Sequence, residues 1–114
     1  MAEARRKLTT IFSADVYGYS RMMEADEERT LARLKRLREA MARLIETQSG
    51  RVVNTWGDGL LAEFASVVEA VRAAVDVQGE LARMDNAGDG TPMLFRIGIN
   101  LGDVIVDGDN IYGE

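Results

Sequence analysis

The sequence of 114 residues contains no cysteine, no histidine and only one proline. Without cysteine, the chain has neither a disulfide framework nor a thiolate metal site. Without histidine, it lacks the usual zinc ligand and the usual general base of enzymes. Any metal chemistry must therefore use oxygen ligands, which favour hard cations such as Mg²⁺ or Mn²⁺.

An excess of positive charge and a long hydrophobic run are also missing. The 14 basic and 19 acidic residues give a net charge of −5, which offers nucleic acid no general electrostatic attraction. The apolar stretch after the basic residues 5–7 is interrupted by Ser13 and Asp15, and it is too short for a signal peptide or a membrane span. We expect a cytoplasmic protein without a membrane segment or a nucleic-acid partner, folded as one domain over residues 1–114.

The spacing of the apolar residues predicts strands and helices in a mixed order. The predicted elements are a strand over 8–15, a long helix from its cap Asp26 to its stop at Gly50, a hairpin of strands 51–55 and 60–64 turning at Asp58-Gly59, a helix opened by a Ser66/Glu69 capping box, and two paired strands on either side of Gly102-Asp103. This order predicts an α+β fold with a ferredoxin-like antiparallel or mixed sheet and helices on one face.

Several side chains receive ordinary structural roles. The apolar face of the second helix is expected to consist of Val67, Val71, Ala74, Val75, Leu81 and Ala82. The solvated face of the long helix is expected to carry Arg29, Arg33, Lys35, Arg36, Arg38 and Arg43. Turns are expected at Asp103, Asp107 and Asp109.

Two aspartates are predicted to meet at one end of the sheet. A right-handed crossover through the long helix makes the second strand parallel to the first, so their carboxyl ends share an edge. Asp15 ends the first strand and Asp58 follows the second. No basic partner is evident for this pair, and two carboxylates repel unless a proton or a cation lies between them. Each residue alone also has a plainer explanation, since Asp-Gly is a common turn and Asp15 can cap a short helix.

The segment Gly18-Tyr19-Ser20 follows Asp15 closely and is predicted to open a short helix. Free backbone N–H groups at such a position can hold phosphate, and glycine lets the backbone approach closely. Glycine after a strand is common, so this feature gains weight from its place three residues beyond a candidate metal ligand.

Three segments together resemble class III adenylate and guanylate cyclases. They are Phe12-Ser13-Ala14-Asp15-Val16-Tyr17-Gly18-Tyr19-Ser20, Thr55-Trp56-Gly57-Asp58-Gly59 and Arg96-Ile97-Gly98-Ile99-Asn100-Leu101-Gly102-Asp103-Val104. The resemblance covers nearly the whole chain in the same order. It implies conversion of ATP or GTP to the cyclic 3′,5′-mononucleotide and pyrophosphate, for cyclic nucleotide signalling, at composite sites of a homodimer.

The resemblance also implies residue roles. Asp15, Asp58 and the backbone carbonyl of Val16 are expected to bind two Mg²⁺ or Mn²⁺ ions, and the amides of Gly18, Tyr19 and Ser20 are expected to hold phosphates. One ion would activate the ribose 3′-hydroxyl and the other would hold the β- and γ-phosphates.

The match departs from the family at the positions that select the base. Adenine-selective members usually have lysine at the position of Asn54, and Asp or Thr at the position of Asn110. An asparagine amide can pair with either purine, so the choice between ATP and GTP stays open. The family's transition-state asparagine and arginine would follow Glu114, so the catalytic domain is expected to be incomplete at its C-terminal end.

Three alternatives compete with an active cyclase. The first is a non-catalytic nucleotide-binding or dimerisation relative, which Asn54 and Asn110 favour. A diguanylate cyclase shares a similar sheet and a two-metal logic, but the spacing around Gly57-Asp58 and Glu63-Phe64 does not fit its contiguous motif. A plain ferredoxin-like binding domain would leave the pairing of Asp15 and Asp58 unexplained.

Overall fold

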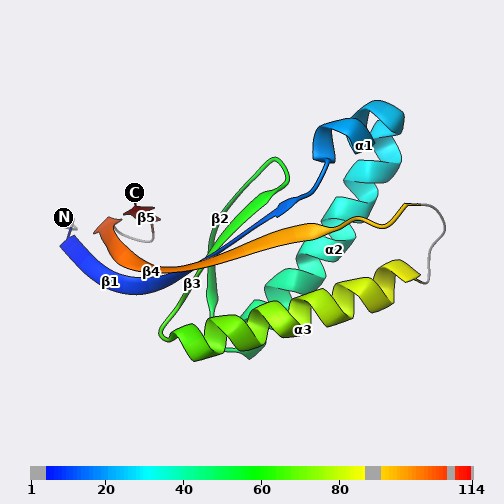
Figure 1. Ribbon diagram of the computed structural model, residues 1–114. Helices are drawn as coiled ribbons and strands as arrows, with labels where there is room; N and C mark the ends of the chain where they lie inside the picture. The colour runs from blue at the N-terminus through cyan, green and yellow to red at the C-terminus, as the bar shows by residue number, and fades with distance from the viewer. Residues whose placement is uncertain (1–4, 87–90, 108–109, 114) are drawn as a thin grey trace.

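The computed structural model describes residues 5–86, 91–107 and 110–113. In chain order, the elements are β1 (Arg5–Val16), α1 (Tyr19–Ala25), α2 (Glu27–Thr47), β2 (Arg51–Trp56), β3 (Gly59–Phe64), α3 (Val67–Asn86), β4 (Phe95–Asp107) and β5 (Asn110–Gly113). The strands form one sheet in the order β2-β3-β1-β4-β5, and every neighbouring pair is antiparallel. Helices α2 and α3 lie on one face of this sheet, which confirms the predicted α+β fold (Figure 1).

The direction of β2 relative to β1 follows the crossover rule, although the two strands are not adjacent in the sheet. β2 runs parallel to β1, but β3 lies between them and is antiparallel to both. The carboxyl ends of β1 and β2 therefore still reach the same end of the sheet.

The core lies between the sheet and the two long helices. The ring of Phe12 on β1 packs against that of Phe64 on β3 with centroids 5.7 Å apart. From α2, the fully buried side chains of Leu37, Met41 and Ile45 reach this cluster. Since each apolar side chain of this size contributes roughly 1.5–3 kcal/mol when buried, this cluster holds α2 on the sheet.

Helix α2 begins as predicted but ends by a different device. The Asp26 carboxylate accepts a hydrogen bond from the Arg29 backbone N–H at 3.1 Å and caps the helix. Ser49, rather than Gly50, has the left-handed backbone that ends the helix, with a φ of 65°. Gly50 is required for another reason, because a Cβ there would lie 2.5 Å from the ring of Phe64.

The expectation that all the basic residues of α2 lie on a solvated face is wrong for two of them. Arg33 is mostly buried and donates to the Asp85 carboxylate and to the Thr91 carbonyl, each at 2.9 Å. Arg38 donates to the backbone carbonyl of Gly57 at 2.6 Å. These two arginines tie α2 to the end of α3 and to the β2–β3 turn.

Helix α3 is capped as predicted, with the Ser66 hydroxyl accepting from the Glu69 N–H at 3.2 Å. The predicted apolar face is right for Leu81, which is buried, and for Ala74, which packs against the core, but it is wrong for the exposed residues Val67, Val71, Val75 and Ala82. The side chains that it buries are Ala70, Ala73, Val77 and Leu81, whereas Val67, Val68, Val71 and Val75 are exposed. The helix carries two apolar stripes, one rich in alanine and one rich in valine. The alanine-rich stripe is the buried one, because its small side chains let the helix pack closer to the sheet and to α2 than valines would. None of the helices described is both long and apolar enough to span a membrane.

The predicted strand pair around Gly102-Asp103 is also wrong, because β4 is one continuous strand of 13 residues. Gly102 and Asp103 pair with Thr9 and Leu8 of β1, so the long first strand carries the ladder through this segment. Asp103 therefore lies within a strand, and Asp107 is the last residue of β4. Asp109 lies outside the described residues.

Candidate active site

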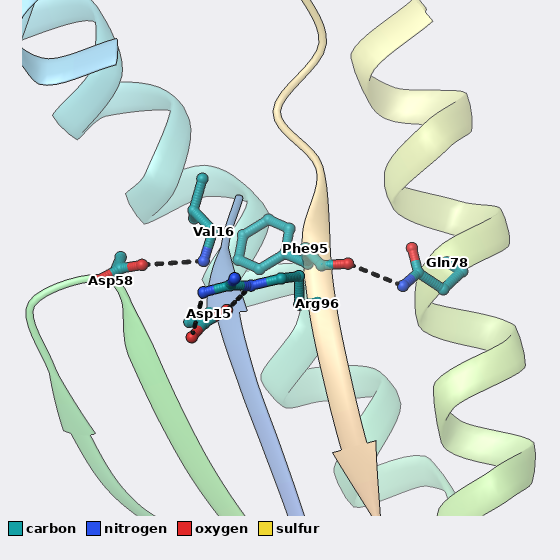
Figure 2. A network of polar contacts seen from close by, with 6 residues as sticks. All are labelled: Asp15, Val16, Asp58, Gln78, Phe95 and Arg96. Atoms are coloured by element: carbon teal, nitrogen blue, oxygen red, sulfur yellow. Dashed lines mark hydrogen bonds and ion pairs between the residues drawn. The ribbon is translucent and has the colours of Figure 1, made fainter. Parts of the chain in front are cut away.

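Asp15 and Asp58 come together through the register of the sheet. The β1–β3 ladder pairs Ala14 with Leu60, so Val16 comes level with Asp58 beyond the last pair. The backbone N–H of Val16 donates to Asp58 Oδ2 at 2.9 Å (Figure 2). The structure therefore confirms that Asp15 and Asp58 lie close together at one end of the sheet.

The turn that presents Asp58 lies one residue earlier than predicted, at Gly57-Asp58. Gly57 has a φ of 49°, as a two-residue hairpin turn with glycine first requires. Gly59 is already the first residue of β3, and a Cβ there would lie 2.5 Å from the indole of Trp56. The bond from Arg38 to the Gly57 carbonyl anchors this turn to α2.

Arg96 is the basic partner that the sequence interpretation did not find. It lies opposite Asp15 in the β1–β4 ladder. Its Nε donates to Asp15 Oδ1 at 2.8 Å and its Nη2 donates to Asp15 Oδ2 at 3.0 Å, which is the bidentate arrangement of Figure 2. Hydrogen bonding to Asp15 raises the pKa of Arg96 further above its ordinary value. The negative charge of Asp15 is thus balanced within the chain.

The backbone beside Arg96 is held by α3. Gln78 Nε2 donates to the carbonyl oxygen of Phe95 at 3.0 Å (Figure 2). The N–H of Tyr17 donates to the carbonyl of Leu94 at 2.8 Å. These contacts fix the start of β4 against the end of β1. They leave the Arg96 side chain itself largely exposed, at 64%.

The segment after β1 completes the site. Gly18 has a φ of 70° and directly precedes α1, which is the short helix predicted after Asp15. A hollow of about 570 Å³ opens here, and its lining residues are Asp15, Val16, Gly18, Tyr19, Ser20, Arg21, Glu24, Asp58 and Arg96. The structure therefore brings all six predicted metal- and phosphate-site residues into one hollow, with Arg21, Glu24 and Arg96 in addition.

The two predicted base-pocket residues do not join this hollow. Asn54 is exposed on β2, beside a register irregularity, and its Oδ1 accepts from the Thr55 N–H at 2.9 Å. Asn110 begins β5 and pairs with Asp107, at the opposite end of β4 from Arg96. Its side chain lies outside what the structure describes.

The side chains of the hollow supply some, but not all, of the oxygen ligands that a hard cation needs. Within the described residues, no three His, Cys, Asp or Glu side chains gather into a metal site. Asp15 and Asp58 supply two carboxylates at the hollow, and Mg²⁺ commonly binds through one or two carboxylates with the remaining ligands from water and substrate phosphates. The residues present therefore fit ions that arrive with a phosphate-bearing ligand.

No protein-family model matches the chain. The protein named "Putative adenylate cyclase 3" of Rhizobium meliloti (strain 1021) is 38% identical over 112 residues, a match that covers 96% of this chain and 19% of that protein. The chain thus spans about a fifth of the length of this curated relative.

Solved structures extend the likeness to the fold. The adenylate/guanylate cyclase/hydrolase from Silicibacter pomeroyi is 36% identical, with a TM-score of 0.87 over 98% of this chain and 66% of that one. The guanylyl cyclase Cya2 has a TM-score of 0.81 at 24% identity, covering 98% of this chain and 64% of that one, and at this identity the likeness concerns the fold alone.

Proposed function

The chain belongs to the class III adenylate and guanylate cyclase family, and we propose that it carries the metal- and phosphate-binding part of a nucleotidyl cyclase site. The reaction would convert ATP or GTP to the cyclic 3′,5′-mononucleotide and pyrophosphate. The observation that carries this proposal is the convergence of Asp15, Asp58 and the Gly18–Ser20 segment on one hollow.

The proposed cofactors are two Mg²⁺ or Mn²⁺ ions, held by Asp15, Asp58 and the Val16 carbonyl. When bound, such ions lower the pKa of the attacking hydroxyl and neutralise the triphosphate. The chain's own residues would place the substrate. The amides of Gly18, Tyr19 and Ser20 would bind the phosphates, and the hydrogen bond from the Val16 N–H would keep the Asp58 carboxylate turned toward the hollow.

A homodimer with composite sites is part of this proposal. Asn54 and Asn110 lie away from the hollow of their own chain, as expected if they meet the base at the site of a partner copy. The alternative is a non-catalytic nucleotide-binding or dimerisation relative, favoured by the same separation of the two asparagines from the carboxylates.

Product analysis tests the proposal. The full-length protein is incubated with ATP or GTP and Mn²⁺, beside Asp58→Asn and the control Asp103→Asn, which removes an exposed carboxylate on β4 outside the hollow. We expect Asp58→Asn to lower the rate of cyclic product by roughly a hundredfold or more, since it removes charge needed in the transition state. Asp103→Asn should retain activity.

The outcome separates the two candidates. No cyclic product from either nucleotide would favour the non-catalytic relative. Full specific activity at a protein concentration where the protein is monomeric would contradict composite sites in a dimer.

A further inference from the structure

The Asp15 carboxylate is held by a cation of the chain itself. Arg96 contacts both of its oxygens, at 2.8 and 3.0 Å. Asp58, in contrast, accepts from the neutral N–H of Val16 at 2.9 Å. The two carboxylates of the hollow are therefore unequal, because Asp15 is hydrogen-bonded directly to a guanidinium, whereas Asp58 interacts with the same charge only at longer range.

The backbone of this ion pair is fixed, and its side chains are open to solvent. Asp15 and Arg96 are direct partners in the β1–β4 ladder, and Gln78 binds the neighbouring Phe95 carbonyl. The side chains of Arg96 and Asp15 are 64% and 44% exposed. Exposed ion pairs contribute little net stability, so the guanidinium can leave the carboxylate at small cost.

We propose that Arg96 is an internal counter-cation that neutralises Asp15 and must be displaced when a divalent ion binds. The inference rests on the proposed function, because it takes Asp15 as a metal ligand. A divalent ion on this carboxylate would lie close to the guanidinium, and the two positive charges repel at such a distance. Arg96 thus lowers the metal affinity of the nucleotide-free site and limits binding of metal before the triphosphate supplies its negative charge. Its role toward the metal is that of a positioning residue acting through Asp15.

The test measures Mn²⁺ binding directly, without nucleotide and without turnover. Free Mn²⁺ is followed by electron paramagnetic resonance during titration of the wild-type protein, Arg96→Gln and Arg96→Lys. We expect Arg96→Gln to raise the association constant about two- to fivefold, the range that an exposed ion pair allows. The association constant of Arg96→Lys should lie between those of the wild type and Arg96→Gln, since lysine keeps the charge but loses the planar bidentate contact.

Two controls separate the ion pair from general charge. Arg21→Gln removes a positive charge that lines the same hollow, and it should raise the Mn²⁺ affinity less than Arg96→Gln does. In an Asp15→Asn background, the Arg96→Gln substitution should raise the Mn²⁺ affinity less than it does in the wild type, because the carboxylate that the arginine contacts directly is gone.

Equal Mn²⁺ affinities for wild type and Arg96→Gln would overturn the proposal. So would an equal gain for Arg21→Gln, or an undiminished gain for Arg96→Gln in the Asp15→Asn background. Failure to form cyclic product while these shifts in Mn²⁺ affinity appear would contradict the proposed cyclisation and support the counter-cation.

Discussion

Glu63 on β3 and Asp15 on β1 are both carboxylates paired with arginine, and their surroundings give them different uses. Glu63 is only 8% exposed and lies 2.9 Å from both Lys7 and Arg51. These contacts join β1, β3 and β2 across the face of the sheet away from the helices. The buried carboxylate of Glu63 stabilises the sheet, whereas the exposed carboxylate of Asp15 can exchange Arg96 for another cation.

Glu63 predicts a pH dependence of stability. Burial is the largest single influence and raises its pKa, but hydrogen bonds from Lys7 and Arg51 offset this, and the net pKa lies below the ordinary 4.5. A carboxylate with a lowered folded-state pKa stabilises fully above its unfolded pKa, and this stability is lost as the pH falls through the folded one.

We therefore expect Glu63→Gln to lower the free energy of unfolding by about 1–2 kcal/mol at pH 7. The difference from wild type should shrink below pH 4.5. Urea denaturation from pH 7 to pH 3 measures it, and a difference that stays constant over this range would contradict the assignment.

For single residues, the sequence predicted that Asp15 and Asp58 lie close together, but it did not predict that Arg96 pairs with Asp15. The two aspartates stand at strand ends that the crossover rule brings together. Arg96 follows Asp15 by 81 positions, and its partner depends on the exact register between β1 and β4. Register is set by tertiary packing along both strands, which a local pattern does not contain.

The sequence predicted where helices and strands begin and end better than it predicted which side of a helix is buried. The cap at Asp26 and the strands flanking the hairpin agree with the structure because local chemistry dictates them. The buried stripe of α3 was predicted only in part, because alanine and valine stripes run side by side on the helix and the shape of the neighbouring surface decides which one is buried. The continuity of β4 depends on the length of its partner β1.

Two glycines provide a prediction at the scale of elements. A Cβ on Gly50 would lie 2.5 Å from the Phe64 ring and 2.7 Å from Ile45, so Gly50→Ala should destabilise by about 1–3 kcal/mol through overpacking. Gly79 lies inside α3 with nothing within 4 Å of a Cβ, so Gly79→Ala should stabilise by about 0.5–1 kcal/mol.

Thermal and urea unfolding of both variants measure these changes. An unchanged stability of Gly50→Ala would show that the junction between α2 and β2 relaxes, and would contradict close packing there.

For the whole molecule, the order of elements places the site. β3 lies between β1 and β2, so the β2–β3 turn and the start of α1 reach the same end of the sheet (Figure 1). The residues proposed for the ions and phosphates line the hollow at this end. The same topology carries Asn110 to the far end of β4. One chain therefore collects the residues proposed for the ions and phosphates in one hollow, and the two residues proposed for the base lie outside it.

We propose that Asp15 and Asp58 together hold the divalent ions of a nucleotide-bound site. Anomalous diffraction at the manganese edge checks this, with crystals grown in Mn²⁺ and an ATP or GTP analogue that cannot be cyclised. We predict two manganese peaks in the hollow, coordinated by both carboxylates and by the phosphates of the analogue. Bound analogue with manganese only elsewhere, away from Asp15 and Asp58, would contradict the account.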